Sequence, residues 1–416
     1  MGPIALATIR TSAVFGLRLL VQAGSLLLLA RMLGPQDYGA FAGISALAVT
    51  LGTLSTFGMH LVLLGEIARD PARRDYVLAR VMPVTLVCGT FLLLVFLLVS
   101  LAGLREAGVS LWVLLPIGAT ETLLQPLFNL PASELLARGR VARSQLLATL
   151  PLALRLAVAV CVVLRAPSNP LAVYAYAYLA VLIVALVIVS LVMRQPWPAP
   201  SAWRWLDKSE WREAAGYAAL NVTAAGPAEL DKTLATRLLP LADSGVYAAG
   251  QRAVSAVILP IGAMMLSALP RLFREGCEQS QRTDRLLRWM LTVTLIYSVA
   301  LATALWFCAP ALAWLFGTKY RDIPHMIHWL CLAVPGMSLR IACGIVLMAF
   351  GKPWMRVCFE LSGLVVLGIA SPILIVHLGA IGMPLALAGS ETMMAVIGML
   401  LVVHARKSRR MSVKLA

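Results

Sequence analysis

Charged residues are scarce in this 416-residue chain, and that shortage decides its class. Only 13% of the residues are Asp, Glu, Lys or Arg, whereas 60% are hydrophobic. A soluble globular domain carries about 25% charged residues, so this chain has too few to cover a surface in water. Apolar runs of about 20 residues, the length that crosses a bilayer as a helix, recur along the chain without the alternation of a barrel strand. The composition predicts an all-α integral membrane protein.

The sequence also lacks the motifs of common enzymes and metal sites. It has no GxxxxGK[ST] phosphate loop, which argues against ATP hydrolysis. Its 7 cysteines have no C-x-x-C spacing and are typical of small apolar fillers. His325 and His328 are too sparse for a metal site, and no Ser/His/Asp or paired-carboxylate arrangement can be assembled. We therefore expect no catalytic residues, no metal and no cofactor.

About twelve transmembrane helices fit the pattern of hydropathy. The first apolar run, residues 11–30, contains Arg18 and is longer than a signal core, so we interpret it as a retained helix. Residues 194–212 are polar and rich in Trp, and their prolines end the sixth helix. We predict an N-terminal six-helix lobe at 1–193, a cytoplasmic interfacial linker at 194–212, and a C-terminal six-helix lobe with a short basic tail at 213–416. The predicted spans are 8–31, 38–63, 79–103, 109–137, 145–165, 171–193, 213–239, 243–270, 286–309, 323–350, 356–377 and 380–404.

One stretch occurs twice. Residues 28–42 read LLARMLGPQDYGAFA and residues 234–248 read LATRLLPLADSGVYA. Aligned without gaps, they match at Arg, Asp and Gly positions, and Phe41 falls opposite Tyr247. The two copies lie almost half a chain apart, which indicates two lobes related by internal duplication. Chance similarity between apolar helices is the alternative.

The basic residues indicate the orientation. If the N-terminus is cytoplasmic, most of the 35 Lys and Arg residues fall in cytoplasmic loops and few fall on the other side. This asymmetry supports an even number of spans with both termini in the cytoplasm. It also accounts for most of the net charge of +16. Because the basic residues are spread over every inner loop, no nucleic-acid partner is expected.

Several charges fall within the predicted spans, where an ionised side chain costs about 2.5–3.5 kcal/mol. Arg18 lies too deep for easy snorkelling, on one polar stripe with Gln22 and Ser25. Such a stripe faces a cavity or a polar neighbour. Mutual pairing that holds helices together is the alternative for every charge in the spans.

Three further basic residues are candidates for a cationic cavity. Lys232 lies three residues after Glu229, so either a ligand contact or a salt bridge along the helix fits it. Arg252 follows Gln251, and Arg340 has no acid within reach on its own helix. The candidate substrate-binding residues are Arg18, Arg252, Arg340, Lys232 and Gln22. Arg155 is assigned to packing of its own lobe.

Acidic residues inside the spans are candidates for coupling to an ion. Burial raises the proton affinity of a carboxylate that lacks a partner. Asp231, Glu360 and Glu391 are positioned to bind or release a proton on this argument. The sequence does not distinguish among the three.

The duplicated stretch resembles a known family. The sequence from Ala30 to Gly39 (ARMLGPQDYG) is similar to the end of the first helix of Wzx-type polysaccharide flippases. Leu230-Asp231-Lys232 followed by 238–247 (LLPLADSGVY) is similar to the seventh-helix signature of the same family. These motifs resemble the polysaccharide-exporter branch of the multidrug/oligosaccharidyl-lipid/polysaccharide transporter superfamily more than its drug-exporter branch.

The resemblance implies a flippase and not an enzyme. Such a protein moves an undecaprenyl-diphosphate-linked sugar repeat unit across the bacterial inner membrane by alternating access, for O-antigen, exopolysaccharide or capsule biosynthesis. Its expected partners are that lipid-linked sugar and the bilayer, with a polysaccharide polymerase and a chain-length regulator as further ones. Arg18 corresponds to a first-helix arginine of related flippases. Two alternatives stay open: a multidrug or small-molecule exporter of the same fold, and a membrane-embedded polysaccharide enzyme.

Overall fold

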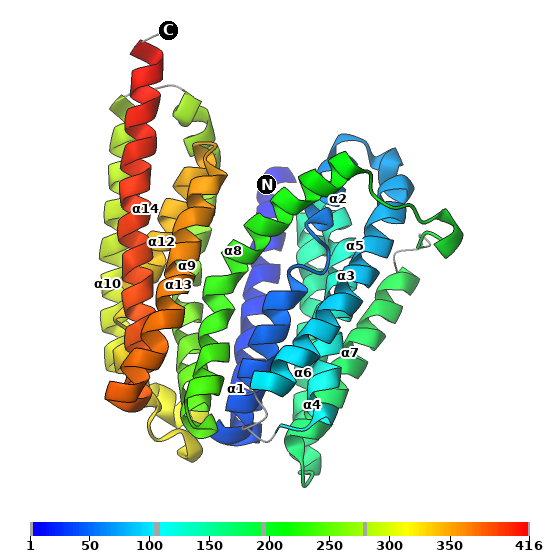
Figure 1. Ribbon diagram of the computed structural model, residues 1–416, viewed down its shortest axis with the longest axis vertical. Helices are drawn as coiled ribbons and strands as arrows, with labels where there is room; N and C mark the ends of the chain where they lie inside the picture. Colours follow the sequence, from blue (N-terminus) through cyan, green and yellow to red (C-terminus); the bar gives the residue numbers. More distant parts are fainter. Residues whose placement is uncertain (1–2, 104–108, 193–196, 278–280, 415–416) are drawn as a thin grey trace. The chain divides into compact units, whose positions relative to one another are not determined.

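The computed structural model describes residues 3–103, 109–192, 197–277 and 281–414, and within these ranges the chain is helical with no strands. Helices account for nearly all of it (Figure 1). The all-α class predicted from composition is confirmed. In the first half the helices are α1 (Pro3–Gly52), α2 (Met59–Arg69), α3 (Arg74–Gly103), α4 (Leu111–Ala119), α5 (Gln125–Ala137), α6 (Val141–Arg165) and α7 (Pro170–Val192).

The described residues of the second half form seven further helices. They are α8 (Lys208–Leu238), α9 (Leu241–Cys277), α10 (Gln281–Phe316), α11 (Ile323–Leu330), α12 (Ala333–Ala349), α13 (Pro353–Leu378) and α14 (Gly382–Lys414). Short turns of other helix types are η1 (Pro71–Arg73), η3 (Thr120–Leu124), η4 (Pro200–Ala202), η5 (Thr318–Tyr320) and η6 (Gly379–Ile381), of which η3 is a π-helix.

Seven stretches of the described chain are long and apolar enough to cross a membrane, and the bent pair of α11 and α12 makes eight. Two of these stretches each contain two helices: Gly16–Gly52 is divided at Gly34, and Trp354–Arg406 contains α13 and α14. The remaining long helices, α8 and α9, have 31 and 37 residues. Together they give twelve spans in the described residues. α8 is the most polar because it carries Glu229, Asp231 and Lys232.

Large apolar side chains on the outside of these helices fit a lipid environment. Leu98 of α3, Leu191 of α7, and Phe307 and Trp314 of α10 are all exposed to more than two thirds of their area. In water such a surface would drive association, whereas in a bilayer it meets hydrocarbon. The chain is a multi-pass membrane protein.

The two copies of the duplicated stretch form comparable turns. In α1 the helix breaks at Gly34, whose φ of 74° and ψ of 174° suit only glycine, and Pro35 begins the next helical segment. In the second copy α8 ends at Leu238 and α9 begins at Leu241, with Asp243 in its first turn. A carboxylate there stabilises the helix N-terminus.

The second predicted span, 38–63, contains a break that the sequence did not reveal. The helix ends at Gly52 and resumes at Met59, and Gly58 has a φ of 77°. Backbone hydrogen bonds within turns join these ends. Thr56 Oγ1, in the break, lies 2.8 Å from His60 Nδ1 at the start of α2. Without a proline, hydropathy alone gave no reason to expect an interruption.

By its internal contacts the chain divides into an N-terminal unit, Met1–Ala225, and a C-terminal unit, Gly226–Ala416. This boundary lies inside α8, and the predicted lobes at 1–193 and 213–416 stay a prediction. Residue 193 of the predicted N-terminal lobe and residues 194–196 of the linker lie outside the described part of the chain. From Trp197 the linker runs against the N-terminal unit: the Arg204 amide donates to the Ala79 carbonyl at 3.0 Å, and Leu206 is buried.

Candidate functional site

Arg18, the first predicted cation, lies half-buried on α1 and is held by α6. Its Nη1 donates to Gln145 Oε1 at 2.7 Å, and two turns further along, Ser25 Oγ donates to the Leu152 carbonyl at 3.5 Å. Both bonds join residues 127 positions apart, so α1 and α6 run in the same direction. Among the described residues Gln145 is the one hydrogen-bond partner of Arg18. The polar neighbour expected beside the stripe is therefore an amide, which leaves the charge of the guanidinium uncompensated.

Gln22 completes the part of this stripe whose side chains the structure describes. It is exposed one turn after Arg18 and has no hydrogen bond to another described residue. Arg18 and Gln22 together present a cation and an amide on one face of α1. Such a pair can bind a phosphate or sugar oxygen, since guanidinium and amide groups both donate.

Arg155 belongs to a different arrangement in the N-terminal unit. Its guanidinium lies 3.9 Å from the centre of the Tyr178 ring and 3.6 Å from Glu121 Oε1, and Nη2 donates to Gln125 at 3.1 Å. Tyr178 also donates to Glu121, a buried residue of the π-helical turn η3. The cation is thus compensated by a carboxylate within its own unit, as expected for a residue that serves packing.

Lys232 in the C-terminal unit is enclosed by carboxylates. Its Nζ lies 3.0 Å from Glu229 Oε2 and 3.5 Å from Asp231 Oδ1, and the Lys232 side chain is only 4% exposed. Tyr247 of α9 donates to the second oxygen of Asp231 at 2.8 Å. The salt bridge that the spacing of Glu229 and Lys232 allowed is present, and a second one with Asp231 accompanies it.

Arg340 has acidic partners that its own helix could not supply. Its Nε donates to Glu391 Oε2 of α14 at 2.7 Å, and its Nη1 lies 3.9 Å from Glu360 of α13. Arg356 also donates to Glu360, at 3.0 Å. Arg340 and both carboxylates are buried. Because α14 packs against both α12 and α13 (Figure 1), the three helices are joined by one ionic network.

The predicted coupling residues each have an oxygen atom that accepts no hydrogen bond from the described residues: Asp231 Oδ1, Glu360 Oε2 and Glu391 Oε1. Asp231 Oδ1 still has the ammonium group of Lys232 at 3.5 Å. Gln251 on α9 is only 1% exposed, and neither its side-chain nitrogen nor its side-chain oxygen makes a hydrogen bond to a described residue. Arg252 follows it and is half-buried. A buried oxygen without a donor favours a proton, a water molecule or a cation beside it.

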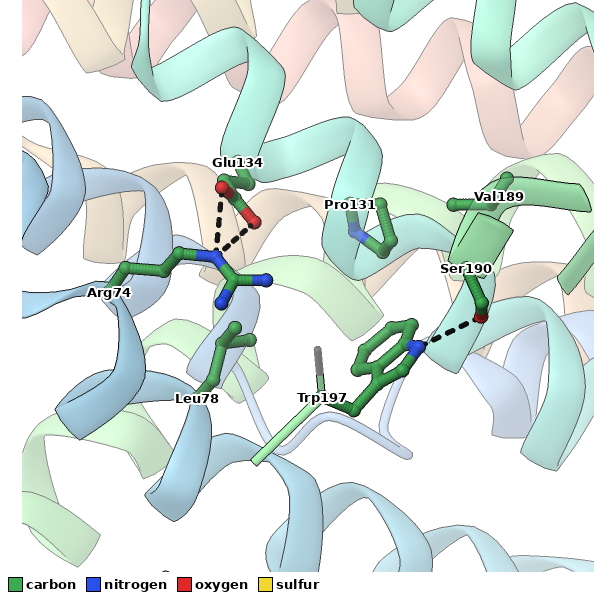
Figure 2. A pocket seen from close by; sticks show the side chains of 7 residues that line it. All are labelled: Arg74, Leu78, Pro131, Glu134, Val189, Ser190 and Trp197. Atoms are coloured by element: carbon green, nitrogen blue, oxygen red, sulfur yellow. Dashed lines mark hydrogen bonds and ion pairs between the residues drawn. The ribbon is translucent and has the colours of Figure 1, made fainter. Parts of the chain in front are cut away.

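A further ionic cluster, which the sequence did not single out, lines a pocket of the N-terminal unit (Figure 2). Arg74 Nε donates to both oxygens of Glu134 at 3.0 Å, and Arg138 lies 2.8 Å from the same carboxylate. Trp197 of the linker covers the other side and donates to Ser190 Oγ at 2.9 Å. The pocket has room for about one water molecule. Its charges already satisfy each other, so we assign it to packing of the linker.

No group of His, Cys, Asp and Glu in the described residues could hold a metal ion. The described cysteines are all free thiols: Cys88, Cys161, Cys308, Cys331, Cys343 and Cys358.

Comparison with known proteins adds a family and a fold. A family described as "Polysaccharide biosynthesis protein" matches residues 7–275. No curated protein matches the sequence. The inward-facing conformation of a multidrug resistance MATE family transporter of the MOP superfamily is similar in structure, with a TM-score of 0.77 and 15% identity, over 94% of this chain and 95% of that chain.

Two more solved structures are similar to the chain. A MOP superfamily transporter from Pyrococcus furiosus, described by the reverse polarity of its binding pocket, has a TM-score of 0.65 at 15% identity and covers 97% of this chain and 96% of its own. MATE in the bent conformation has a TM-score of 0.64 at 16% identity, over 99% and 97%. These likenesses concern the fold. The chain shares its fold with these membrane transporters.

Proposed function

The chain belongs to the polysaccharide biosynthesis protein family, and from that premise we propose that it is a flippase for lipid-linked oligosaccharides. It moves undecaprenyl-diphosphate-linked repeat units across the bacterial inner membrane by alternating access, for O-antigen, exopolysaccharide or capsule biosynthesis. Both termini lie in the cytoplasm, as the distribution of Lys and Arg favours.

One observation carries the proposal: Arg18 is a cation within a spanning helix whose described partner is a neutral amide. An ionised side chain in a membrane helix costs about 2.5–3.5 kcal/mol, so an uncompensated one marks a functional site. A diphosphate supplies the missing negative charge, because its oxygens accept paired hydrogen bonds from a guanidinium. Arg18 therefore binds the diphosphate while the lipid tail stays in the bilayer.

The C-terminal unit has a second role in this proposal. Lys232 and Arg340 are each balanced by carboxylates, so they bind an anion only after a carboxylate is protonated or moves away. Asp231, Glu360 and Glu391 each offer an oxygen without a hydrogen bond. Protonation of these residues is the proposed coupling step, and Arg252 is the third substrate-binding candidate of this unit.

A multidrug exporter of the same fold is the second candidate, favoured by the likeness to MATE transporters. The Pyrococcus furiosus transporter, which has a similar fold, is described as having a binding pocket of reverse polarity, so a similar fold by itself does not decide the charge of the substrate. A drug cation requires an acidic site, whereas Arg18 is basic and held by an amide. The charge at Arg18 therefore favours the lipid-linked sugar.

The test is deletion of the gene followed by complementation. The deletant should accumulate lipid-linked repeat units in the inner leaflet and lose surface polysaccharide. Arg18→Ala, at wild-type abundance in the membrane, should fail to complement. Arg18→Lys should restore function in part, because lysine keeps the positive charge but lacks the paired N–H donors of the guanidinium. Normal surface polysaccharide in a deletant that has no second exporter would refute the flippase. Export of drug cations by the purified protein, without movement of polyprenyl diphosphate, would favour the second candidate.

A further inference from the structure

The contact between Arg18 and Gln145 differs from the other arginine and lysine contacts described above for the spans. Lys232 and Arg340 lie within 3.0 Å of a carboxylate oxygen, and Arg155 lies 3.6 Å from one. Arg18 instead donates one hydrogen bond to an uncharged amide at 2.7 Å. A glutamine can fix the position of a guanidinium without reducing its charge.

We infer that Gln145 is the positioning residue for Arg18, and that its neutrality is required for binding the phosphates of the transported headgroup. The inference rests on the proposed function, in which Arg18 contacts the diphosphate. Gln145 occupies Nη1 and leaves Nε and Nη2 without an acceptor among the described residues. These two groups form the edge of the guanidinium that binds two anionic oxygens in parallel. Gln145 thus orients the guanidinium of Arg18, and the positive charge stays available to bind the substrate.

Gln145 is well placed to act as a fixed point. The preceding residue, Ser144, is buried and donates to the Ala132 carbonyl of α5 at 2.7 Å. One turn later, Thr149 donates to the Gln145 carbonyl at 2.8 Å. The first turns of α6 are therefore tied to α5 and to themselves, while the bond from Ser25 to Leu152 keeps α1 in register with α6. A side chain held on such a frame restricts the rotamers of Arg18.

The N-terminal unit offers a matched control. Gln125 accepts a hydrogen bond from Arg155 at 3.1 Å, so it is also a half-buried glutamine bound to an arginine of a spanning helix. Arg155, however, already lies beside Glu121 and over the ring of Tyr178. A carboxylate in place of Gln125 adds to an ion pair that exists, whereas one in place of Gln145 creates a new pair and removes a free charge.

The experiment compares Gln145→Glu with Gln145→Met in the full chain. Both variants keep the length of the side chain, but glutamate neutralises Arg18 and methionine only removes the acceptor. Movement of a short-chain, fluorescently labelled polyprenyl diphosphate is measured in vesicles of phosphatidylethanolamine and phosphatidylglycerol. We expect Gln145→Glu to slow movement by at least about tenfold, with thermal stability equal to or above wild type. Gln145→Met should be faster than Gln145→Glu, and Gln125→Glu should stay within about threefold of wild type.

A purely structural role predicts the opposite order, because glutamate retains an acceptor for Arg18 and methionine does not. Movement by Gln145→Glu equal to or faster than by Gln145→Met would overturn the inference. If Gln145→Glu does not reach the membrane, Gln145→Asp and Gln145→Asn provide the same comparison of charge at equal side-chain length. The inference then requires slower movement of the labelled lipid by Gln145→Asp than by Gln145→Asn. Normal movement by Arg18→Ala would refute the substrate contact itself. An inactive Arg18→Ala beside a fully active Gln145→Glu would refute only the role of Gln145.

Discussion

Replacing Arg340 by methionine should strongly destabilise the C-terminal unit. Arg340 is 7% exposed, and its guanidinium donates at 2.7 Å to Glu391, which is 0% exposed. Without it, Glu391 remains buried with no described donor, since its other oxygen already has none. Glu360 is affected less, because it keeps Arg356 at 3.0 Å. Removing one partner of a buried ion pair costs about 3–5 kcal/mol.

Thermal unfolding of the purified protein in detergent measures this effect, and the 10 tryptophans provide the signal. For a domain of about 150–250 residues, 1 kcal/mol corresponds to about 2–4 °C in Tm. Arg340→Met should therefore lower the Tm by at least about 6 °C. Adding Glu391→Leu should recover most of the loss, because an apolar pair replaces a buried ion pair at little cost.

Arg356→Met is the matched control, since it removes a more exposed arginine from the same network. Its side chain is 26% exposed, and Glu360 would still have Arg340 at 3.9 Å. We expect a smaller loss than for Arg340→Met, because the charge of Arg340 stays beside Glu360 whereas Glu391 would have no cation left among its described contacts. A shift in Tm for Arg340→Met that does not exceed the shift for Arg356→Met would show that Glu391 is not left uncompensated, and the argument for a buried network would fail.

Three further predictions concern the N-terminal unit. Gly34→Ala should lower the free energy of unfolding by about 1–3 kcal/mol, because φ 74° with ψ 174° is open only to glycine; Gly16→Ala, in open space on the same helix, is the control and should change little. Tyr178→Phe should cost about 1–3 kcal/mol by removing the donor to buried Glu121, and a Tm equal to wild type would contradict that hydrogen bond. Leu206→Asp should release the linker and speed its cleavage by trypsin in vesicles, whereas unchanged cleavage relative to the exposed-site control Trp205→Asp would contradict its docking.

Much of the fold could be predicted because hydropathy and length are local properties. About twelve spans were expected, and the described helices are long enough for twelve once the two double stretches are divided and α8 and α9 are added. The duplicated stretch marks a helix junction in each half. The break between Gly52 and Met59 was missed because its sequence, threonine- and serine-rich but free of proline, gives no strong signal. The path of the linker was also missed, since docking of Leu206 and Trp197 depends on surfaces formed by other helices.

The site shows the same division at the level of single residues. The sequence identified Arg18, Lys232 and Arg340 as charges in the membrane, and it offered Glu229 as a partner for Lys232 because both lie on one helix. It offered no partner for Arg340, whose carboxylate comes from a residue 51 positions away. For Arg18 the partner lies 127 positions away. Helical spacing reveals neighbours on one helix only, so partners on other helices stay hidden.

By itself the sequence determined that this protein resides in a membrane, how many helices cross it, and which spans carry charge. These properties follow from composition and from the hydrophobic period of single helices. The tertiary structure alone decided which charges are compensated. Arg340 and Lys232 meet carboxylates, whereas Arg18 meets the amide of Gln145. The physical reason is that the free energy of a buried charge depends on the groups that packing brings within about 4 Å of it, and packing is a property of the whole fold.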